Sequence, residues 1–564
     1  MKLRLAAALF ASLSLSACMT AGSSAPEAAI PQRARVQLLA INDFHGNLET
    51  PLSPTRYADG GVDRSERLGG AAQLAATLAS LRRANSVTVA AGDLIGASPL
   101  ASSLFLDEPT IRALSQMGLE IASVGNHEFD RGVDELRRMQ HGGCAQFTRR
   151  QPCALDPFTG AQFTYLAGNV VDPFGETLLP ATMTREIDGA TIGFIGLTLE
   201  GTANLVAASA TDGYEFLDEA ETANDLAQQL RMDGADAVVL LIHEGADVDP
   251  RYNLSGCPGL SGAIVPIVEA LDPAISVVIS GHTHQSYVCD VIRPDGSPLL
   301  LTSAGRYGGF VTDIEMVIDH ANDQVLAANG VNVPVLQSGT ADPAIAALVA
   351  RYAEAAGPVA NRQVGAIHDS GEHGEDCLDS PAQELVADSY LVGGRATMGE
   401  DAVDLAFVNS GGVRTDLTGA DDGVLSYGEL VAMSPFGNGI VVLEMTGEEL
   451  KALLEQQWCE IDGQVRTCPS LLIPSANMTY RVDRAAPVGQ RISAIMLDGA
   501  PIDPARSYKV ITPSFLAGGG DGFSVFAQAA ARGTTMAGFD IDLLEGYVAR
   551  GDLAVPVCGR VRSL

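Results

Sequence analysis

The sequence predicts an α/β fold in two parts, and three observations carry this prediction. Apolar strands and helical stretches alternate through the first half of the chain. A helix-like segment then follows, and a second region beyond it has apolar strands of its own. Since the chain has 564 residues, far more than one ordinary domain, two domains are expected.

The first half contains six apolar runs rich in β-branched residues. Between them lie Ala- and Leu-rich stretches with helical spacing, such as residues 69–84. This alternation predicts an α/β domain whose sheets are buried between helices. The predicted strands are VQLLAI (36–41), SVTVAA (86–91), IASV (121–124), TIGFIGLT (191–198), AVVLLI (237–242) and ISVVIS (275–280).

The connecting segment reads DPAIAALVARYAEAAGPVANR (342–362), which predicts a helix that stops at Gly357-Pro358. After it come the apolar stretches VDLAFVNSGGVRTDL and GIVVLEMTGEELKALLEQ. We therefore expect domains at 35–340 and 363–564, joined by a linker helix at 341–362.

The N-terminus MKLRLAAALFASLSLSAC has a positive start at Lys2 and Arg4, then a short apolar run typical of an export signal. LSAC resembles a bacterial lipobox. We predict a lipoprotein signal peptide at 1–17, a lipid anchor on Cys18 as the only membrane attachment, and a flexible tether at 18–34. The protein would then be an exported lipoprotein of the cell envelope. The alternative is an ordinary signal peptide with a chance cysteine.

The nine cysteines suit an oxidising compartment, because eight remain once Cys18 carries lipid. Cys144 with Cys153 and Cys459 with Cys468 are close in sequence. Cys257 with Cys289 would form a third bridge, and Cys377 with Cys558 is what is left over. A metal cluster is the rival interpretation, but no tight Cys-x-x-Cys spacing supports it.

The charge limits the choice of partner. The composition is globular, with 46% hydrophobic and 18% charged residues, and the formal net charge is -34. Such a surface repels the backbone of a nucleic-acid polymer. A small anionic substrate would have to be attracted locally, by cations or metals. A monomer is favoured.

Five of the predicted strands end in residues that bind metals. In open α/β sheets, sites gather outside the carboxyl ends of the strands. One polar residue after a strand is ordinary turn chemistry, but five such endings are not explained that way. They are Asn42-Asp43-Phe44-His45, Gly92-Asp93, Gly125-Asn126-His127-Glu128, His243-Glu244 and Gly281-His282-Thr283-His284.

Imidazole and carboxylate ligands suit divalent ions such as Zn, Mn or Co. In an extended segment, Asp-x-His places alternate side chains on one face, so Asp43 and His45 are expected to reach one ion, as are His282 and His284. A carboxylate shared by two ions would give a two-metal site, which clamps a phosphoryl group and activates water.

The ordered pattern D-x-H, G-D, G-N-H-E, H-E and G-H-T-H resembles the calcineurin-like metallophosphoesterases. More narrowly, the chain resembles the bacterial bifunctional metallophosphatase/5'-nucleotidase family, because NSGGVR (409–414), SPFGN (434–438) and FLAGGGDGF (515–523) match its C-terminal substrate-binding domain. The resemblance implies an N-terminal four-layer α/β/β/α sandwich, a linker helix and a second α/β (α+β) domain.

By the same resemblance, one ion takes Asp43, His45, Asp93 and His284, and the other takes Asp93, Asn126, His243 and His282. Asp93 is then the bridge. His127 and Asp130 match the family's catalytic dyad, in which the imidazole stabilises charge on the phosphoryl group and the carboxylate orients it. The nucleophile would be metal-bound water. Glu128 has no assigned role, and Phe129 is expected in the core.

The resemblance also implies the residues that recognise the substrate. Phe436 and Phe515 would stack on the nucleobase, although phenylalanine is more often a core residue. Asn409 and Arg414 would contact base, ribose or phosphate, and Asn438 the base. Asp521 would accept hydrogen bonds from ribose hydroxyls, or only cap its own turn.

The sequence departs from the family in two places. GEHGEDCLDSPAQELVAD (371–388) has no arginine or lysine where many members carry an arginine, and PSANMTY (474–480) replaces a Ser-Gly-aromatic element.

The leading hypothesis is a two-metal 5'-nucleotidase for nucleotide salvage. The alternatives are a 2',3'-cyclic nucleotide phosphodiesterase/3'-nucleotidase, a nucleotide-sugar or NAD pyrophosphatase, and a catalytically silent nucleotide-binding protein. We also expect hinge rotation near residues 342–362.

Overall fold

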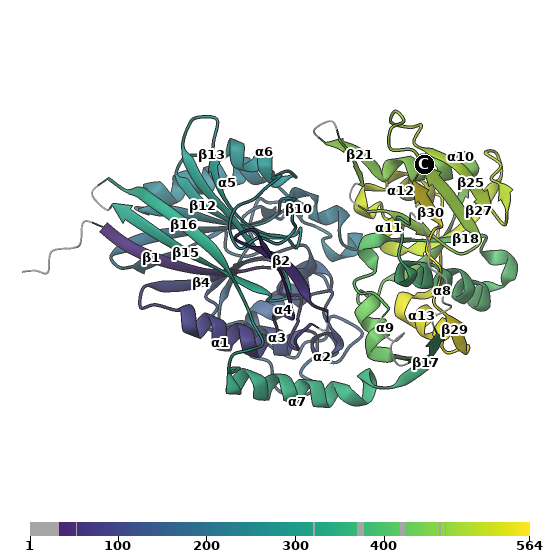
Figure 1. The fold of residues 1–564 in the computed structure, drawn as a ribbon, viewed down its shortest axis with the longest axis horizontal. Helices are drawn as coiled ribbons and strands as arrows, with labels where there is room; N and C mark the ends of the chain where they lie inside the picture. Colours follow the sequence, from purple (N-terminus) through teal and green to yellow (C-terminus); the bar gives the residue numbers. More distant parts are fainter. Residues whose placement is uncertain are drawn as a thin grey trace, which may run out of the picture.

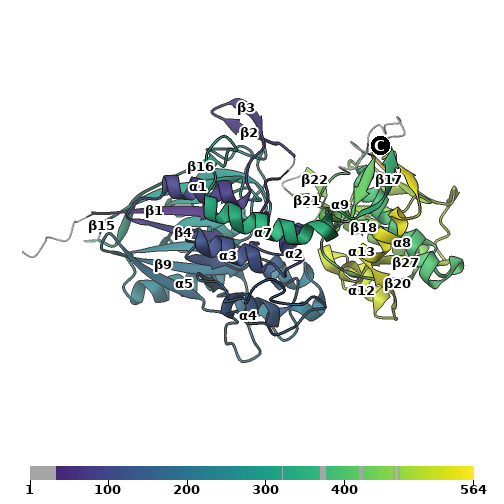
Figure 2. The ribbon, with the colours of Figure 1, turned by 90° about the horizontal axis from the view of Figure 1, so that it is seen from below.

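The computed structural model describes residues 33–51, 53–319, 322–368, 377–417, 423–461, 464–467 and 470–563. The chain forms two lobes joined by a long helix, α7 (Pro343–Ala360), which runs from one lobe to the other (Figures 1 and 2). The predicted signal peptide and Cys18 lie outside the described residues. Strand β1 begins at Arg33, so it includes the last two residues of the predicted tether.

Two six-stranded sheets form the N-terminal lobe, and they contain all six predicted strands. The first sheet has the order β16 (Gln324–Pro334), β15 (Phe310–Asp319), β1 (Arg33–Ile41), β4 (Ser86–Ala91), β5 (Ile121–Ser123) and β6 (Thr164–Leu166). The second has the order β13 (Ser286–Ile292), β14 (Pro298–Ala304), β12 (Ile275–Ser280), β11 (Ala237–His243), β9 (Ala190–Thr198) and β8 (Thr182–Ile187).

The layers follow from how side chains alternate along each strand. Leu38, Val89, Phe194 and Val239 are buried in one apolar cluster that draws on both sheets. The next residue of β1, Leu39, packs instead with α1 (Ala71–Leu81), α3 (Glu108–Gln116) and α4 (Val133–His141). The second sheet is covered by α5 (Glu219–Met232) and α6 (Ile264–Ala270). These layers confirm the predicted α/β/β/α sandwich.

The linker helix α7 begins where the sequence predicts but does not stop at Gly357-Pro358. Asp342 caps its first turn by accepting hydrogen bonds from the N–H groups of Ala344 and Ile345. The helix then continues through Pro358 to Ala360, and the predicted stop is wrong. Gly357 lacks the Cβ that would clash with the ring of Pro358, and only Val359 and Ala360 follow the proline within the helix.

The C-terminal lobe also combines helices and sheets. Its five-stranded sheet has the order β23 (Leu472–Pro474), β18 (Leu405–Asn409), β27 (Ser507–Pro513), β20 (Gly439–Thr446) and β28 (Thr535–Phe539). Two smaller sheets are β26 (Ala500–Pro501), β25 (Ile492–Leu497), β24 (Met478–Val482) and β30 (Val561–Ser563), and β19 (Val424–Ser426), β17 (Gln363–His368) and β29 (Asp552–Ala554). The helices include α8 (Pro381–Met398), α9 (Tyr427–Met433), α10 (Gly447–Gln456), α12 (Ser524–Ala530) and α13 (Asp540–Val548).

Three of the four predicted disulfides are present: Cys144–Cys153, Cys257–Cys289 and Cys377–Cys558. The fourth, Cys459–Cys468, lies outside the residues whose side chains are described. Within the described residues, no helix is long and apolar enough to cross a membrane.

Candidate functional site

The five polar strand ends meet at one place between the two sheets. β1, β4 and β5 are parallel neighbours in the first sheet, and β11 and β12 are parallel neighbours in the second. Their carboxyl ends therefore open toward the same region, and the loops that follow bring the predicted ligands together.

The backbone of these loops differs from the extended form that the sequence suggested. Asp43 and His45 have φ angles of 48° and 46°, and Asp93, His282 and His284 lie at 50°, 69° and 59°. The prediction of an extended Asp-x-His segment is thus wrong, although both side chains still reach one point. Non-glycine residues in this left-handed region carry strain, of order 1–3 kcal/mol each in sparsely populated conformations.

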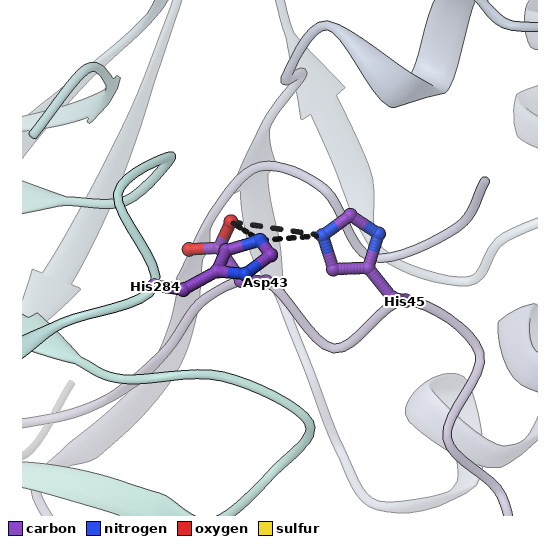
Figure 3. A group of neighbouring side chains, drawn as sticks. All are labelled: Asp43, His45 and His284. Carbon is purple, nitrogen blue, oxygen red and sulfur yellow. Dashed lines mark hydrogen bonds and ion pairs between the residues drawn. The ribbon is translucent and has the colours of Figure 1, made fainter. Parts of the chain in front are cut away.

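The first ligand group consists of Asp43, His45 and His284, all buried (Figure 3). Nε2 of His284 lies 3.4 Å from Oδ1 of Asp43 and 3.1 Å from Nε2 of His45. Atoms bound to one zinc ion at about 2 Å in a tetrahedral site are roughly 3.3 Å apart, so this spacing suits a shared ion.

The second ligand group consists of Asp93, His243 and His282. Oδ2 of Asp93 lies 3.0 Å from Nε2 of His243 and 3.5 Å from Nε2 of His45 in the first group. This carboxylate therefore stands between the two groups, as a bridging ligand would. Oδ1 of Asn126 lies 3.2 Å from Nδ1 of His282, which brings the predicted amide ligand to the same group.

The donor atoms fit divalent cations. Oδ1 of Asp43 and Nε2 of His243 are buried and make no hydrogen bond of good geometry, although Nε2 of His284 and Oδ2 of Asp93 lie 3.4 Å and 3.0 Å from them. A bound cation would satisfy both atoms. Nδ1 of His45 donates to the carbonyl of Gly96 at 3.0 Å, and Nδ1 of His243 donates to that of Ala91 at 2.8 Å. These bonds fix the tautomer in which each Nε2 is a free electron-pair donor.

His127 and Asp130 form a hydrogen-bonded pair beside the ligands. Nδ1 of His127 lies 2.9 Å from Oδ2 of Asp130, and the backbone N–H of His127 donates to Oδ1 of Asp93 at 2.9 Å. Burial lowers the pKa of His127, but the carboxylates of Asp130 and Asp93 outweigh it, so the pKa is raised above its usual value. The imidazole can therefore donate a proton or a hydrogen bond to an anion.

Glu128, for which sequence reasoning found no role, holds two of the ligand loops together. Its Oε2 accepts from the N–H groups of Asp93 at 2.9 Å and Gly125 at 2.6 Å, and its Oε1 accepts from Leu94 at 2.8 Å. Burial and the charge of Asp93 raise its pKa to about 7. No signal in the sequence marks this role, because the partners of Glu128 are backbone N–H groups. Phe129 is fully buried, as expected.

Residues of the C-terminal lobe reach this pair. The ring of Phe436 stacks on that of His127, with centroids 5.6 Å apart and planes at 20°. Nη2 of Arg414 lies 3.5 Å from Nε2 of His127, and its guanidinium carbon is 5.5 Å from the Phe436 centroid. The dyad and the predicted substrate residues thus share one site between the lobes.

The remaining predicted residues line the same cavity. Nδ2 of Asn409 donates to Oδ2 of Asp521 at 2.8 Å. Burial raises the pKa of Asp521. The cavity is lined by Asn126, His127, Asp130, His282, Asn409, Gly411, Gly412, Arg414, Phe436, Asn438, Phe515 and Asp521, and by the apolar Leu205, Val206 and Ala207, which were not predicted. No chemical signal marked those three apolar residues in the sequence.

Comparison with known proteins gives two family matches. Residues 36–286 match the family model described as calcineurin-like phosphoesterase, and residues 336–528 match that of the 5'-nucleotidase C-terminal domain. The chain is 29% identical over 501 residues to endonuclease YhcR of Bacillus subtilis, and 30% identical over 526 residues to cell wall protein Lmo0130 of Listeria monocytogenes.

Each of these two alignments covers 88% of this chain, but only 38% of the first relative and 64% of the second. The fold is also that of the 5'-nucleotidase precursor from Thermus thermophilus. That likeness has a TM-score of 0.74 and 22% identity, and it covers 94% of this chain and 99% of the other.

Proposed function

Since the chain belongs to the calcineurin-like phosphoesterases that carry a 5'-nucleotidase C-terminal domain, we propose that it hydrolyses nucleoside 5'-monophosphates to nucleoside and phosphate. Two divalent ions, of the Zn, Mn or Co type, would be held by the two ligand groups. Asp43, His45, Asp93 and His284 would take one ion, and Asp93, Asn126, His243 and His282 the other.

One observation carries the proposal: the predicted dyad and the residues predicted to recognise the base line a single cavity. The stacked contact between His127 and Phe436 joins the two lobes at that point. A metal site alone would fit any phosphoester, whereas an aromatic side chain beside it favours a substrate with a flat base.

The ions, when bound, would activate water and neutralise charge on the phosphoryl group. His127, oriented by Asp130, would donate a hydrogen bond to a phosphoryl or leaving-group oxygen. Phe436 and Phe515 would stack on the base, which is worth about 1–3 kcal/mol per base. Asn409, Arg414, Asn438 and Asp521 would provide the polar contacts to base, ribose and phosphate.

A substrate panel at fixed metal tests the reaction class. It should contain 5'- and 3'-monophosphates, a 2',3'-cyclic nucleotide, a nucleoside diphosphate sugar and NAD. We expect the 5'-monophosphates to be preferred, and Asp93→Ala to abolish turnover of all of them. A preparation that binds metal and nucleotide but hydrolyses none of the panel would instead indicate a nucleotide-binding protein.

Phe436→Ala tests base recognition. It should lower kcat/KM for nucleotides by roughly five- to 150-fold, from the stacking energy above, and leave an aryl phosphate nearly unaffected. Phe174→Ala, at a ring that is 90% exposed, is the matched control. An equal loss on nucleotide and aryl phosphate would contradict the base-stacking role.

We further propose that the protein works in the cell envelope as a lipid-anchored monomer. The three bridges suit an oxidising compartment, and the names of two similar proteins, one a cell wall protein and one a precursor, support export. Cys18→Ser should release the protein from membranes, and size-exclusion chromatography with light scattering gives its mass. Release of the wild-type protein from membranes by salt alone would argue against a lipid anchor.

A further inference from the structure

A loop of the N-terminal lobe contacts the end of strand β28 in the C-terminal lobe, next to the segment 434–438 that carries Phe436 and Asn438. The guanidinium carbon of Arg149 lies 4.1 Å from the ring centroid of Phe539, the last residue of β28 in the C-terminal lobe. A cation this close to an aromatic face is attracted by the ring. Arg149 belongs to none of the ligand or dyad positions, so this contact lies outside the site described above.

The loop that carries Arg149 is fixed to its own lobe at several points. The Cys144–Cys153 disulfide closes it. The N–H of Cys153 donates to Oε1 of the buried Glu108 at 2.9 Å, and Nη1 of Arg150 donates to the carbonyl of Ser103 at 2.7 Å. Arg149 is therefore presented from a braced loop, even though its own side chain is exposed.

On the other side, Phe539 is joined directly to the segment that carries Asn438. Phe539 pairs with Gly439 across β28 and β20. The next residue, Asp540, donates its N–H to the carbonyl of Asn438 at 3.0 Å and accepts the N–H of Asn438 on Oδ2 at 2.8 Å. Asp540 is only 1% exposed, so these bonds are shielded from water.

We propose that Arg149 is a positioning residue for nucleotide hydrolysis: through Phe539 and Asp540 it holds the recognition segment 434–438 in register with His127. The proposal rests on the proposed function for its kinetic consequence. Phe436 is two residues from Asn438 and stacks on His127, so a shift of this segment changes where the base lies relative to the dyad. An aryl phosphate lacks the ribose and the base, and the predicted ligands and the dyad all come from the N-terminal lobe, so its turnover should depend less on the position of Asn438.

The kinetic test compares Arg149→Ala with the wild type on a nucleoside 5'-monophosphate and on p-nitrophenyl phosphate. An exposed cation–π contact is worth a factor of about two to five. We expect kcat/KM for the nucleotide to fall by that factor, mainly through KM, and the aryl phosphate rate to stay unchanged. Arg149→Lys should recover part of the loss.

Arg137→Ala is the matched control, because Arg137 lies over the ring of Tyr214 at 5.8 Å within the N-terminal lobe alone. It should not change the nucleotide to aryl phosphate ratio. Phe539→Leu should reproduce the effect of Arg149→Ala, and the double variant should lose less than the product of the two single losses. Arg149→Ala behaving like Arg137→Ala, or losing equally on both substrates, would overturn the proposal.

Hydrogen–deuterium exchange gives a readout that needs no substrate. The amides of residues 438–440 should exchange faster in Arg149→Ala than in the wild type or in Arg137→Ala. Unchanged exchange there would overturn the proposal even if nucleotides are good substrates. Faster exchange in a protein that hydrolyses no nucleotide would retain the positioning contact and reject the proposed reaction.

Discussion

At the scale of single residues, Gly96 shows how little space surrounds the dyad. A Cβ at this position would lie 2.5 Å from the carbonyl oxygen of His127 and 2.7 Å from Oδ2 of Asp130. Its own carbonyl accepts the bond that fixes the tautomer of His45. One glycine thus touches the predicted dyad and supports a predicted metal ligand.

Gly96→Ala should therefore damage the site more than it damages the fold. Displacing Asp130 or the His45 ring by even about 1 Å is expected to cost on the order of a hundredfold in kcat. Gly175→Ala is the control, because Gly175 has the same φ of 81° but nothing within 4 Å of its Cβ position. Equal rates in the two variants at matched metal content would show that the close approach does not matter.

Neighbouring residues are expected to divide the chemistry between them. His127→Ala should keep both metals and lower kcat by about 10²–10⁴, the usual contribution of a positioned proton donor. Asn126→Ala should instead lower the affinity for one of the two ions, by about 10–100-fold, as removal of other groups that support a metal site does. Metal content by mass spectrometry, measured beside kcat, separates the two. Metal loss in His127→Ala would reverse the assignment.

The sequence predicted that these candidate ligands come together, because each lies directly after an apolar strand, where the residue type is informative. It did not predict the positive φ of Asp43 and His45, because several backbone paths bring the same side chains together. Glu128 was missed for a related reason. Its partners are backbone N–H groups of residues 93, 94 and 125, and backbone donors leave no mark in a sequence.

At the scale of elements, strands were predicted more accurately than helix ends. Apolar runs such as residues 237–242 are fully buried in a sheet, and burial gives a strong pattern. The end of α7 depends instead on the last turn around Pro358, where the tendency of Gly357-Pro358 to end a helix competes with continuation of the helix. A local breaker signal does not decide such cases.

The start of α13 gives a pH prediction. Burial raises the pKa of Asp540 to about 7, although hydrogen bonds from the N–H groups of Asn438 and Ile541 oppose this. The folded-state pKa lies above the ordinary 3.8, so the contribution to stability is complete below about pH 4 and is lost as the pH rises through 7.

Asp540→Asn removes this titration. As the pH rises from 4 to 8, the unfolding free energy of the wild type should therefore fall relative to that of the variant, by about 1 kcal/mol or more. Urea unfolding at each pH measures it. A difference that stays constant over this range would mean that Asp540 has the same pKa in the folded and unfolded protein.

At the scale of the whole molecule, the two lobes meet with the dyad against Phe436, and α7 connects them (Figure 1). In this arrangement the cavity between the lobes is lined from both sides. We propose that substrate entry and product exit require the lobes to separate by rotation near residues 342–362. This proposal comes from the two-lobed organisation and from the family resemblance.

A tether between the lobes tests this rotation. The short helices η2 (Glu200–Asn204) and η7 (Gly520–Gly522) lie in contact. A pair of cysteines, one introduced in each helix at facing positions, would form a disulfide across the cavity. The oxidised protein should lose most nucleotide turnover, because exchange of substrate and product is blocked. Single-cysteine variants under the same oxidation are the controls. Unchanged turnover in the bridged protein would rule out the rotation.

The three disulfides also set an order for biosynthesis. Those of the N-terminal lobe join residues 9 and 32 positions apart, whereas Cys377–Cys558 spans 181 positions. In the export proposed above, the first lobe could therefore be oxidised while the second is still being delivered. The bridge of the second lobe must wait for residue 558, so a nascent chain interrupted before it would carry the two N-terminal bridges but not this one.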